Sequence, residues 1–264
     1  MEIEKIYKDT NYRILKLPLK NATIHVFTGL QPLSVNSFII ETNNNLVIID
    51  AQLSIENAKL LNKYANSLHK PMAKVILTHA HYDHYRGLPV FPHEITYALA
   101  ETIADFTKLE VEDNVIPQNA LPKNFTVENL TYECFNFKNA HCPNHLVMYI
   151  KEIKTLVLGD LAQENTHLLA MNFPSFIHAL TTIKQQFSKA EYLLTGHGKI
   201  TPLATMSTNL AYMTKCFEIY KNSKSNEEFN TKVLQEFPNM VKINPPLYYL
   251  FQGDPSIPIE TKTN

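Results

Sequence analysis

The chain is poor in the residues and segments that mark several common protein classes. It holds only three cysteines, Cys134, Cys142 and Cys216, among 264 residues. This odd and sparse set gives no disulfide framework, so a reducing, cytoplasmic compartment is the simplest expectation. No stretch approaches the roughly 18 apolar residues of a membrane-spanning helix. Residues 1–9 mix charges without an apolar segment, and we expect no signal peptide.

The chain also has no excess of positive or negative charge. Lysine and arginine together number 24 against 25 acidic residues, which leaves a net charge of −1. Without a global positive field, neither nucleic acid nor an anionic membrane is expected as a partner. The hydrophobic content of 45% and charged content of 19% are those of an ordinary globular protein.

The most informative stretch that is present reads THAHYDH and begins at residue 78. It places His79, His81, Asp83 and His84 within six residues. If residues 74–78 form a strand, His79 and His81 project to the same side, because strand side chains alternate. Clustered imidazoles repel when protonated and need several partners when buried, so a structural purpose explains them poorly. The run predicts a pair of neighbouring metal sites.

Further residues that could bind a metal stand next to predicted strands, where α/β folds place their functional loops. They are Asp50, His141 with His145, Asp160, and His197. Each alone has an ordinary explanation; an Asp after a strand is more often a helix cap or a turn residue. Together with the first run, they form the specific order His-x-His-x-Asp-His, then His, then Asp, then His.

Glycine is scarce, and its placement is informative. Four of the six glycines, Gly87, Gly159, Gly196 and Gly198, lie beside candidate ligands. Because glycine permits backbone conformations and close approaches that other residues resist, we expect tight loops around one site.

The remaining pattern predicts strands mixed with helices. Strands are expected at 12–17, 23–27, 37–41, 46–50, 74–78, 130–137, 145–151, 155–158 and 191–194. Helices are expected at 54–68, 98–109 and 175–188, with two more in 203–237 that separate near 222–226, and 117–122 reads as a loop. The strand, helix and strand across 46–78 imply a crossover unit, and one domain of mixed sheets with outer helices is the economical interpretation.

The order of the candidate ligands resembles the metallo-β-lactamase-fold superfamily, over about residues 50–198. The resemblance implies an α/β fold, a four-layer αββα sandwich with the site at one edge of its two sheets. We therefore expect a single domain over 1–264, with a core over about 12–200 and a helical C-terminal extension over about 201–264.

The resemblance also implies the roles of the site residues. It implies a first metal on His79, His81 and His141, a second on Asp83, His84 and His197, and Asp160 bridging both. Asp50 matches an acidic residue that orients a ligand from behind the site, as metal-bound imidazoles generally require. The run at 140–145 looks like the family's Gly-His-Thr-x-Gly-His, in which the first His is the ligand. His145 is therefore expected to be structural or to lie near the substrate. Cys142 is either a soft ligand or reactive thiol, or a small buried filler.

The reaction implied is a hydrolysis that depends on two zinc ions per chain. A metal-bound hydroxide would cleave an ester, thioester, lactone or related bond in a small molecule, with Asp83 as the catalytic group that orients the nucleophile. The ligand set fits the glyoxalase II and lactonase branches better than the zinc β-lactamases, many of which use a Cys where this chain has Asp160.

Two alternatives stay open. One is an enzyme like the persulfide dioxygenases, with one iron on His79, His81 and His141; Fe or Mn would then replace zinc. The other is a non-catalytic metal-binding scaffold.

Two aromatic segments leave their roles open. Tyr82, Tyr85 and Phe91 could form an aromatic rim at the site or simply pack against neighbouring loops. The apolar tail over 245–251 could cover the pocket mouth, pack on the core or join two subunits of a homodimer.

Overall fold

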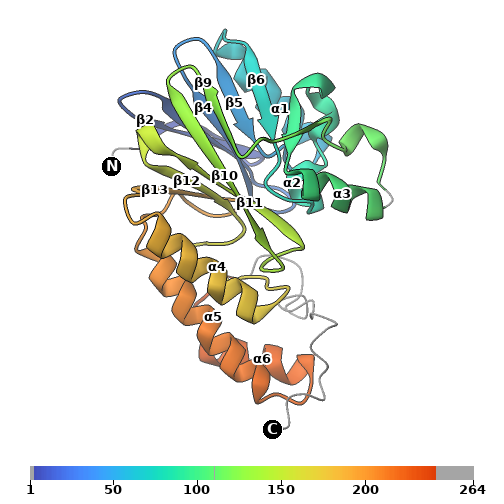
Figure 1. The fold of residues 1–264 in the computed structure, drawn as a ribbon, viewed down its shortest axis with the longest axis vertical. Helices are drawn as coiled ribbons and strands as arrows, with labels where there is room; N and C mark the ends of the chain where they lie inside the picture. Colours follow the sequence, from blue (N-terminus) through green and yellow to red (C-terminus); the bar gives the residue numbers. More distant parts are fainter. Residues whose placement is uncertain (1–2, 110, 242–264) are drawn as a thin grey trace.

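Two β-sheets form the centre of the protein in the computed structural model, which describes residues 3–109 and 111–241 (Figure 1). The first sheet holds eight strands in sequence order: β1 (Glu4–Lys8), β2 (Tyr12–Pro18), β3 (Thr23–Gly29), β4 (Val35–Glu41), β5 (Leu46–Ile49), β6 (Met72–Ile76), β7 (Thr96–Ala98) and β8 (Asn119–Ala120). The second sheet has the order β13 (Tyr192–Thr195), β12 (Thr155–Gly159), β11 (Asn144–Ile150), β10 (Leu130–Lys138) and β9 (Asn124–Val127).

The core between the sheets is built from the inward-facing side chains of both. Phe38 and Val47 of the first sheet meet Leu146 and Met148 of the second in one apolar cluster, and each is at most 2% exposed. In β5 all four residues are buried, because this central strand is covered on both faces. Burial of apolar surface of this kind is the main force that holds the sheets together.

Helices cover the outer face of each sheet. On the first sheet, α1 (Ile55–Ser67) contributes Ala58 and Leu61 to a second apolar cluster, and α3 (Ala100–Lys108) contributes Phe106. Tyr85 of α2 (Tyr82–Tyr85) packs against this cluster. Residues of the second sheet, such as Leu156, pack with α4 (Phe173–Gln186) and α5 (Thr205–Lys221) in a third cluster, and α6 (Asn226–Glu236) continues this cluster below the sheet. Short 3-10 helices lie at Leu88–Val90, His93–Ile95, Asp113–Val115 and Lys151–Ile153. The four-layer αββα sandwich expected from the sequence is confirmed.

Parallel strand pairs direct several chain segments toward one edge of the sandwich. β5 pairs in parallel with β6 and is joined to it through α1, whose first turn is capped by Ser54 Oγ accepting from Asn57 N at 3.1 Å. β12 pairs in parallel with β13 and is joined to it through α4. The segments that follow these four strands carry Asp50 and six of the seven candidate ligands; the seventh, His141, lies between β10 and β11.

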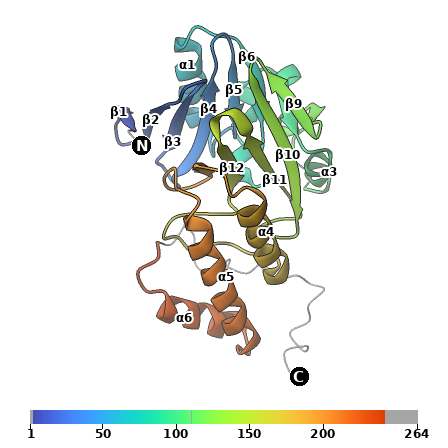
Figure 2. The same cartoon turned by 60° about the vertical axis from the view of Figure 1, so that its left-hand side comes forward.

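The helical part at the C-terminal side extends away from the sandwich. Figures 1 and 2 show α5 and α6 continuing below both sheets, while α1 and α3 remain beside the first sheet. The division into a core and an extension stays a prediction, and the aromatic tail at 245–251 lies outside the described residues. None of the described helices combines the length and apolar character that crossing a bilayer requires.

Most of the strands and helices expected from the sequence are present, with some differences. β6 ends at Ile76, two residues before the expected end, and the segment expected as a loop at 117–122 contains β8. β1, β7, β8, β9 and α2 were not predicted. β7 and β8 are too short to show a hydrophobic period, and β1 is exposed along its whole length, so it has no apolar alternation to detect.

Candidate metal centre

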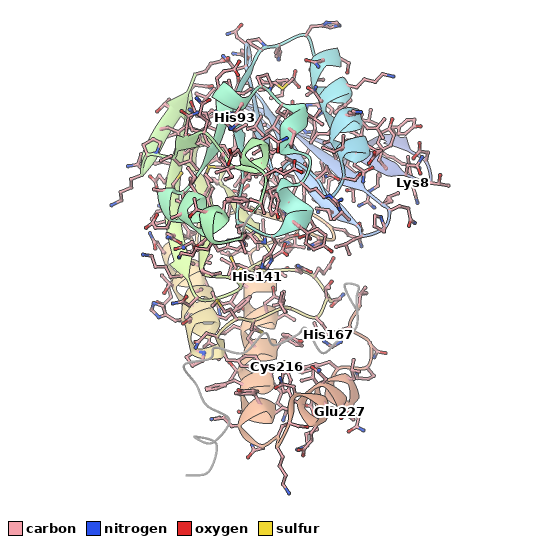
Figure 3. All side chains as sticks on the ribbon, turned by 90° about the vertical axis from the view of Figure 1, so that its right-hand side faces the viewer. Lys8, His93, His141, His167, Cys216 and Glu227 are labelled. Atoms are coloured by element: carbon pink, nitrogen blue, oxygen red, sulfur yellow. The ribbon has the colours of Figure 1, made fainter. Side chains whose placement is uncertain are left out.

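The seven residues predicted as metal ligands lie together at one edge of the sandwich. They form two groups that share Asp160; within each group, one ligand atom per residue lies within 4.8 Å of the others. The first group is His79, His81, His141 and Asp160, and the second is Asp83, His84, Asp160 and His197. Figure 3 shows His141 where the sandwich meets the helices below it. The structure thus brings all seven together, and their role as ligands stays a prediction.

Three of the imidazoles are held from outside by a hydrogen bond at Nδ1. The Nδ1 of His141 lies 2.9 Å from the Leu169 carbonyl, and that of His197 lies 2.6 Å from the Ser34 carbonyl. The Nδ1 of His84 lies 2.9 Å from Asp50 Oδ2. Carbonyl and carboxylate oxygens only accept hydrogen bonds, so Nδ1 must donate, and a neutral ring then presents the lone pair of Nε2.

These Nε2 atoms converge on the Asp160 carboxylate. His84 Nε2 lies 3.4 Å from Asp160 Oδ1, while His141 and His197 Nε2 lie 3.5 and 3.3 Å from Oδ2. On the other side of the first group, His81 Nδ1 lies 2.9 Å from His141 Nε2. The arrangement suits a carboxylate that contacts two neighbouring cations.

Unpaired buried polar atoms at the centre show whether the residues present fit a metal. His79 Nε2, His84 Nε2 and Asp160 Oδ1 are buried and have no hydrogen-bond partner within the described residues. Buried polar atoms are normally paired, and here the unpaired ones face the same space. Imidazole nitrogen and carboxylate oxygen are donors that zinc accepts. The residues present therefore fit a metal pair.

The second group pairs negatively charged carboxylates with imidazoles whose positive form is stabilised. Burial would raise the pKa of Asp83, but the adjacent His84 and His197 outweigh it and hold that pKa well below its usual range. Burial likewise works against a charged His197, yet Asp160 and Asp83 raise its pKa to about 10. These carboxylates are thus ionised and need positive charge beside them.

The imidazoles of the first group are neutral instead. Burial, and then the neighbouring His141, lowers the pKa of His81 to about 3. Burial also lowers the pKa values of His79 and His141. Neutral imidazole is the form that coordinates a metal.

Two glycines allow the strand ends to approach the site. A Cβ at Gly196 would lie 2.1 Å from Asp160 Oδ1 and 2.7 Å from His84 Cε1. Gly159 has a φ of +48°, and a Cβ there would lie 2.7 Å from the ring of His145. A larger residue at Gly196 would displace two candidate ligands, and one at Gly159 would displace His145, so the expectation of tight loops is confirmed at these two positions.

His145 is placed as a support rather than as a ligand. Its Nε2 accepts from the backbone N–H of Asp160 at 3.2 Å, and its Nδ1 lies 3.1 Å from the Leu146 carbonyl. Its ring stacks on that of His79, with centroids 4.6 Å apart. Both nitrogens are engaged by backbone groups, which favours the structural alternative.

Cys142 and Phe91 are buried in the interior, and Tyr85 is half-buried against it. The Cys142 thiol donates to the Asn144 carbonyl at 3.2 Å and belongs to neither metal-binding group. Burial raises its pKa, so a ligand or reactive thiol role is disfavoured. Phe91 lies in the cluster beneath α1, and Tyr85 packs edge-on against Phe106. Only Tyr82, which is 54% exposed, remains as a candidate for the aromatic rim.

Sequence reasoning missed the groups that support the site from a distance. Asn36 in β4 is fully buried, and its Nδ2 donates to the Thr195 carbonyl at 2.9 Å and the Gly198 carbonyl at 3.2 Å. It therefore ties the loop that carries His197 to the opposite sheet. A lone amide within an apolar strand was the only available signal.

Comparisons with known proteins bear on the sequence pattern and on the fold. A sequence model of the metallo-beta-lactamase superfamily matches residues 30–111, a segment that contains the first His/Asp run. No curated protein matches the sequence.

Solved structures resemble the fold at low sequence identity. The DIM-1 metallo-β-lactamase exposed to ceftazidime has a TM-score of 0.67 and 19% identity, covering 79% of this chain and 99% of its own. VMB-1 has a TM-score of 0.68 and 14% identity, with coverage of 79% and 99%. The mono-zinc form of FIM-1 from Pseudomonas aeruginosa has a TM-score of 0.66 and 16% identity, with coverage of 79% and 97%. These findings confirm the resemblance: the chain has the metallo-β-lactamase fold, and its residues 30–111 carry the sequence pattern of that superfamily.

Proposed function

We propose that the chain is a metal-dependent hydrolase of the metallo-β-lactamase superfamily that uses two zinc ions to cleave an ester, thioester, lactone or related bond in a small molecule. The observation that carries the proposal is the pair of four-residue groups that share Asp160. The superfamily match and the fold support the general activity. The two zinc ions and the bond type rest on the donor set and on the resemblance of the motif.

Zinc, when bound, polarises a substrate oxygen and lowers the pKa of a coordinated water toward about 7. The protein residues would position the reacting groups. Asp83 Oδ2 lies 3.4 Å from His197 Nε2 and 3.5 Å from His84 Nε2, and its carboxylate is ionised. It can therefore accept a hydrogen bond from the attacking water and hold its proton. Asp50 behind His84, and Leu169 behind His141, keep these rings oriented.

The donor types in the second group bear on the substrate class. Two of the similar structures, DIM-1 and FIM-1, are named as metallo-β-lactamases, and the first was exposed to ceftazidime, but identities below 20% carry only the fold. Within the described residues, neither group contains a thiol. The resemblance of the motif implies that Asp160 stands where many zinc β-lactamases have a Cys. This difference favours hydrolysis of an ester, thioester or lactone over that of a β-lactam.

The decisive experiment is elemental analysis of protein purified without added metal, combined with a substrate panel. The panel would contain a small ester, a thioester, a lactone and a cephalosporin. We expect about two zinc per chain and turnover of a member other than the cephalosporin. His81→Ala and Asp83→Ala should abolish that turnover and reduce bound zinc. Full activity in either variant would refute the site assignment.

Other results would select the alternatives. About one iron per chain without hydrolysis would favour the iron oxygenase, because three imidazoles serve iron as well as zinc. Bound metal with no activity in either assay would favour the scaffold. Turnover of the cephalosporin alone would move the proposal to a β-lactamase.

A further inference from the structure

The loop between β12 and α4, residues 161–172, is buried more deeply than most surface connections. Ala162, Gln163, His167 and Leu168 are each at most 2% exposed. The loop begins directly after Asp160 and ends at Asn172, the cap of α4. Loops normally run over the surface, where water satisfies their backbone groups, so this one must find its partners inside the protein. We call it the bridging loop.

The bridging loop holds one side of the candidate metal centre. The Leu169 carbonyl lies 2.9 Å from His141 Nδ1 and accepts its hydrogen. The backbone N–H groups of Met171 and Asn172 both donate to the Ala140 carbonyl, at 2.8 and 3.3 Å. The loop thus runs from one candidate ligand, Asp160, to the group that orients another, His141.

Helix α5 holds the bridging loop from its other side. Asn209 is 1% exposed; its Oδ1 accepts from the backbone N–H of Gln163 at 2.9 Å, and its Nδ2 donates to the Gln163 carbonyl at 2.8 Å. One turn later, the Tyr212 hydroxyl lies 3.0 Å from His167 Nδ1. Figure 3 shows His167 and Cys216, a residue of α5, below His141 in the helical part. The helices therefore reach the site through this loop.

Asn209 is an unusual choice for packing alone. On α5 it shares a helix face with Met206 and Met213, which belong to the same apolar cluster as Leu168 of the bridging loop. A buried amide is unfavourable unless it is hydrogen-bonded, whereas an aliphatic residue would fill the space without that requirement. Its two bonds to one backbone residue fix the course of the loop three residues after Asp160.

We propose that Asn209 is a positioning residue for the candidate metal centre: it holds the bridging loop so that the Leu169 carbonyl keeps His141 turned toward the metal. The inference rests on the proposed function and gives the C-terminal helices a part in it. Outer groups that orient a ligand typically contribute 10–100-fold to metal affinity. Asn209 acts one step further from the metal, so we expect an effect near the lower limit.

The test compares Asn209→Leu with the unsubstituted protein by two measurements. The leucine keeps the branched shape and the number of side-chain heavy atoms, and it removes both hydrogen bonds. Competition with a chelator of known affinity should show zinc bound about tenfold more weakly. In metal-free protein, nitrogen-15 NMR of the imidazoles should show faster exchange of the His141 Nδ1 hydrogen. The matched control is Val233→Ala in α6, which thins the same apolar cluster but removes no hydrogen bond. It should leave both measurements unchanged.

The outcomes separate this inference from the proposed function. Zinc bound with unchanged affinity by Asn209→Leu, together with unchanged His141 exchange, overturns the inference and leaves the hydrolase proposal intact. An equal weakening by Val233→Ala also overturns it, because general loosening would then explain the effect. If the unsubstituted protein binds no zinc, the hydrolase proposal fails, and His141 exchange alone decides whether Asn209 positions the ring. If Asn209→Leu does not fold, Tyr212→Phe, which loses only the hydroxyl near His167, should produce smaller changes in the same direction.

Discussion

Asp50 and His84 lie one behind the other at the candidate metal centre, joined by a hydrogen bond of 2.9 Å between Asp50 Oδ2 and His84 Nδ1. Both side chains are at most 1% exposed. Asp50 has a left-handed backbone with φ of 60°, and its carboxylate also accepts from the N–H and hydroxyl of Thr78. One carboxylate therefore connects the end of β5, the start of the His run and the ring of His84.

Asp50→Asn tests this connection. The amide keeps the shape but has one acceptor oxygen in place of two, so it cannot serve both Thr78 and His84 as the carboxylate does. We expect zinc affinity at the group that contains His84 to fall by about 10–100-fold, measured by chelator competition. Asp9→Asn, at an exposed turn before β2, should bind zinc like the unsubstituted protein. Equal affinity in Asp50→Asn would show that His84 needs no carboxylate behind it.

Gly196→Ala and Gly198→Ala form a matched pair within one loop. At Gly196 the added carbon would lie 2.1 Å from Asp160 Oδ1, so we expect loss of bound zinc as measured by elemental analysis. At Gly198 nothing lies within 4 Å, but the φ of +84° is strained for alanine. That variant should lose about 1–2 kcal/mol of unfolding free energy and keep its zinc. Equal zinc loss in both would indicate general disruption of the loop.

Cys142→Ser tests whether the thiol contributes to the site. The serine hydroxyl can still donate to the Asn144 carbonyl, as the thiol does at 3.2 Å. Because the thiol belongs to neither group, zinc content should stay the same within measurement error. A loss of one zinc equivalent would mean that the loop at 140–145 contributes a sulfur ligand.

The buried His25 predicts a pH dependence of stability away from the site. Its Nδ1 lies 2.7 Å from the Tyr64 hydroxyl and its Nε2 lies 2.8 Å from Glu41. Burial lowers the pKa of His25 in the folded protein, and the positive Lys16 and Lys70 add to this effect, while Glu41 opposes it. The unfolded chain therefore takes up a proton first as the pH falls below about 6.5.

The free energy of unfolding should accordingly fall as the pH drops from about 7 to 5, by at most about 1.4 kcal/mol per pH unit from this residue. His25→Gln cannot titrate, so the difference between the two proteins in urea denaturation isolates His25. If the difference in unfolding free energy between the two proteins does not change with pH, the prediction is contradicted. It is also contradicted if the unsubstituted protein becomes the more stable of the two as the pH falls.

The parts of the site that could be predicted from the sequence are those whose residues lie close together in the chain or directly after an apolar strand. The four candidate ligands of the first run, from His79 to His84, are recognisable because they lie within six residues. Asp160 and His197 are recognisable because each follows an apolar strand. Ser34 and Leu169 could not be found, since they act through backbone carbonyls that any residue would offer. Asn209 lies far along the chain in a helix whose sequence shows no sign of the loop it contacts.

The same limit applies to the fold. α1 and its cap at Ser54 were predictable because local residues determine them. β7 pairs with β6 and with β8 through only two residue pairs each, and pairings this short leave no local pattern in the sequence.

The two candidate ligand groups draw their residues from both sheets, so a bound metal would stabilise the contact between the sheets. In the first group, His79 and His81 follow a strand of the eight-stranded sheet, while His141 and Asp160 adjoin strands of the five-stranded sheet. The second group is divided in the same way, with Asp83 and His84 on one side and Asp160 and His197 on the other. Each ion would therefore cross-link the two sheets. Chelation would then lower the melting temperature as well as the activity, by favouring separation of the two sheets at this edge.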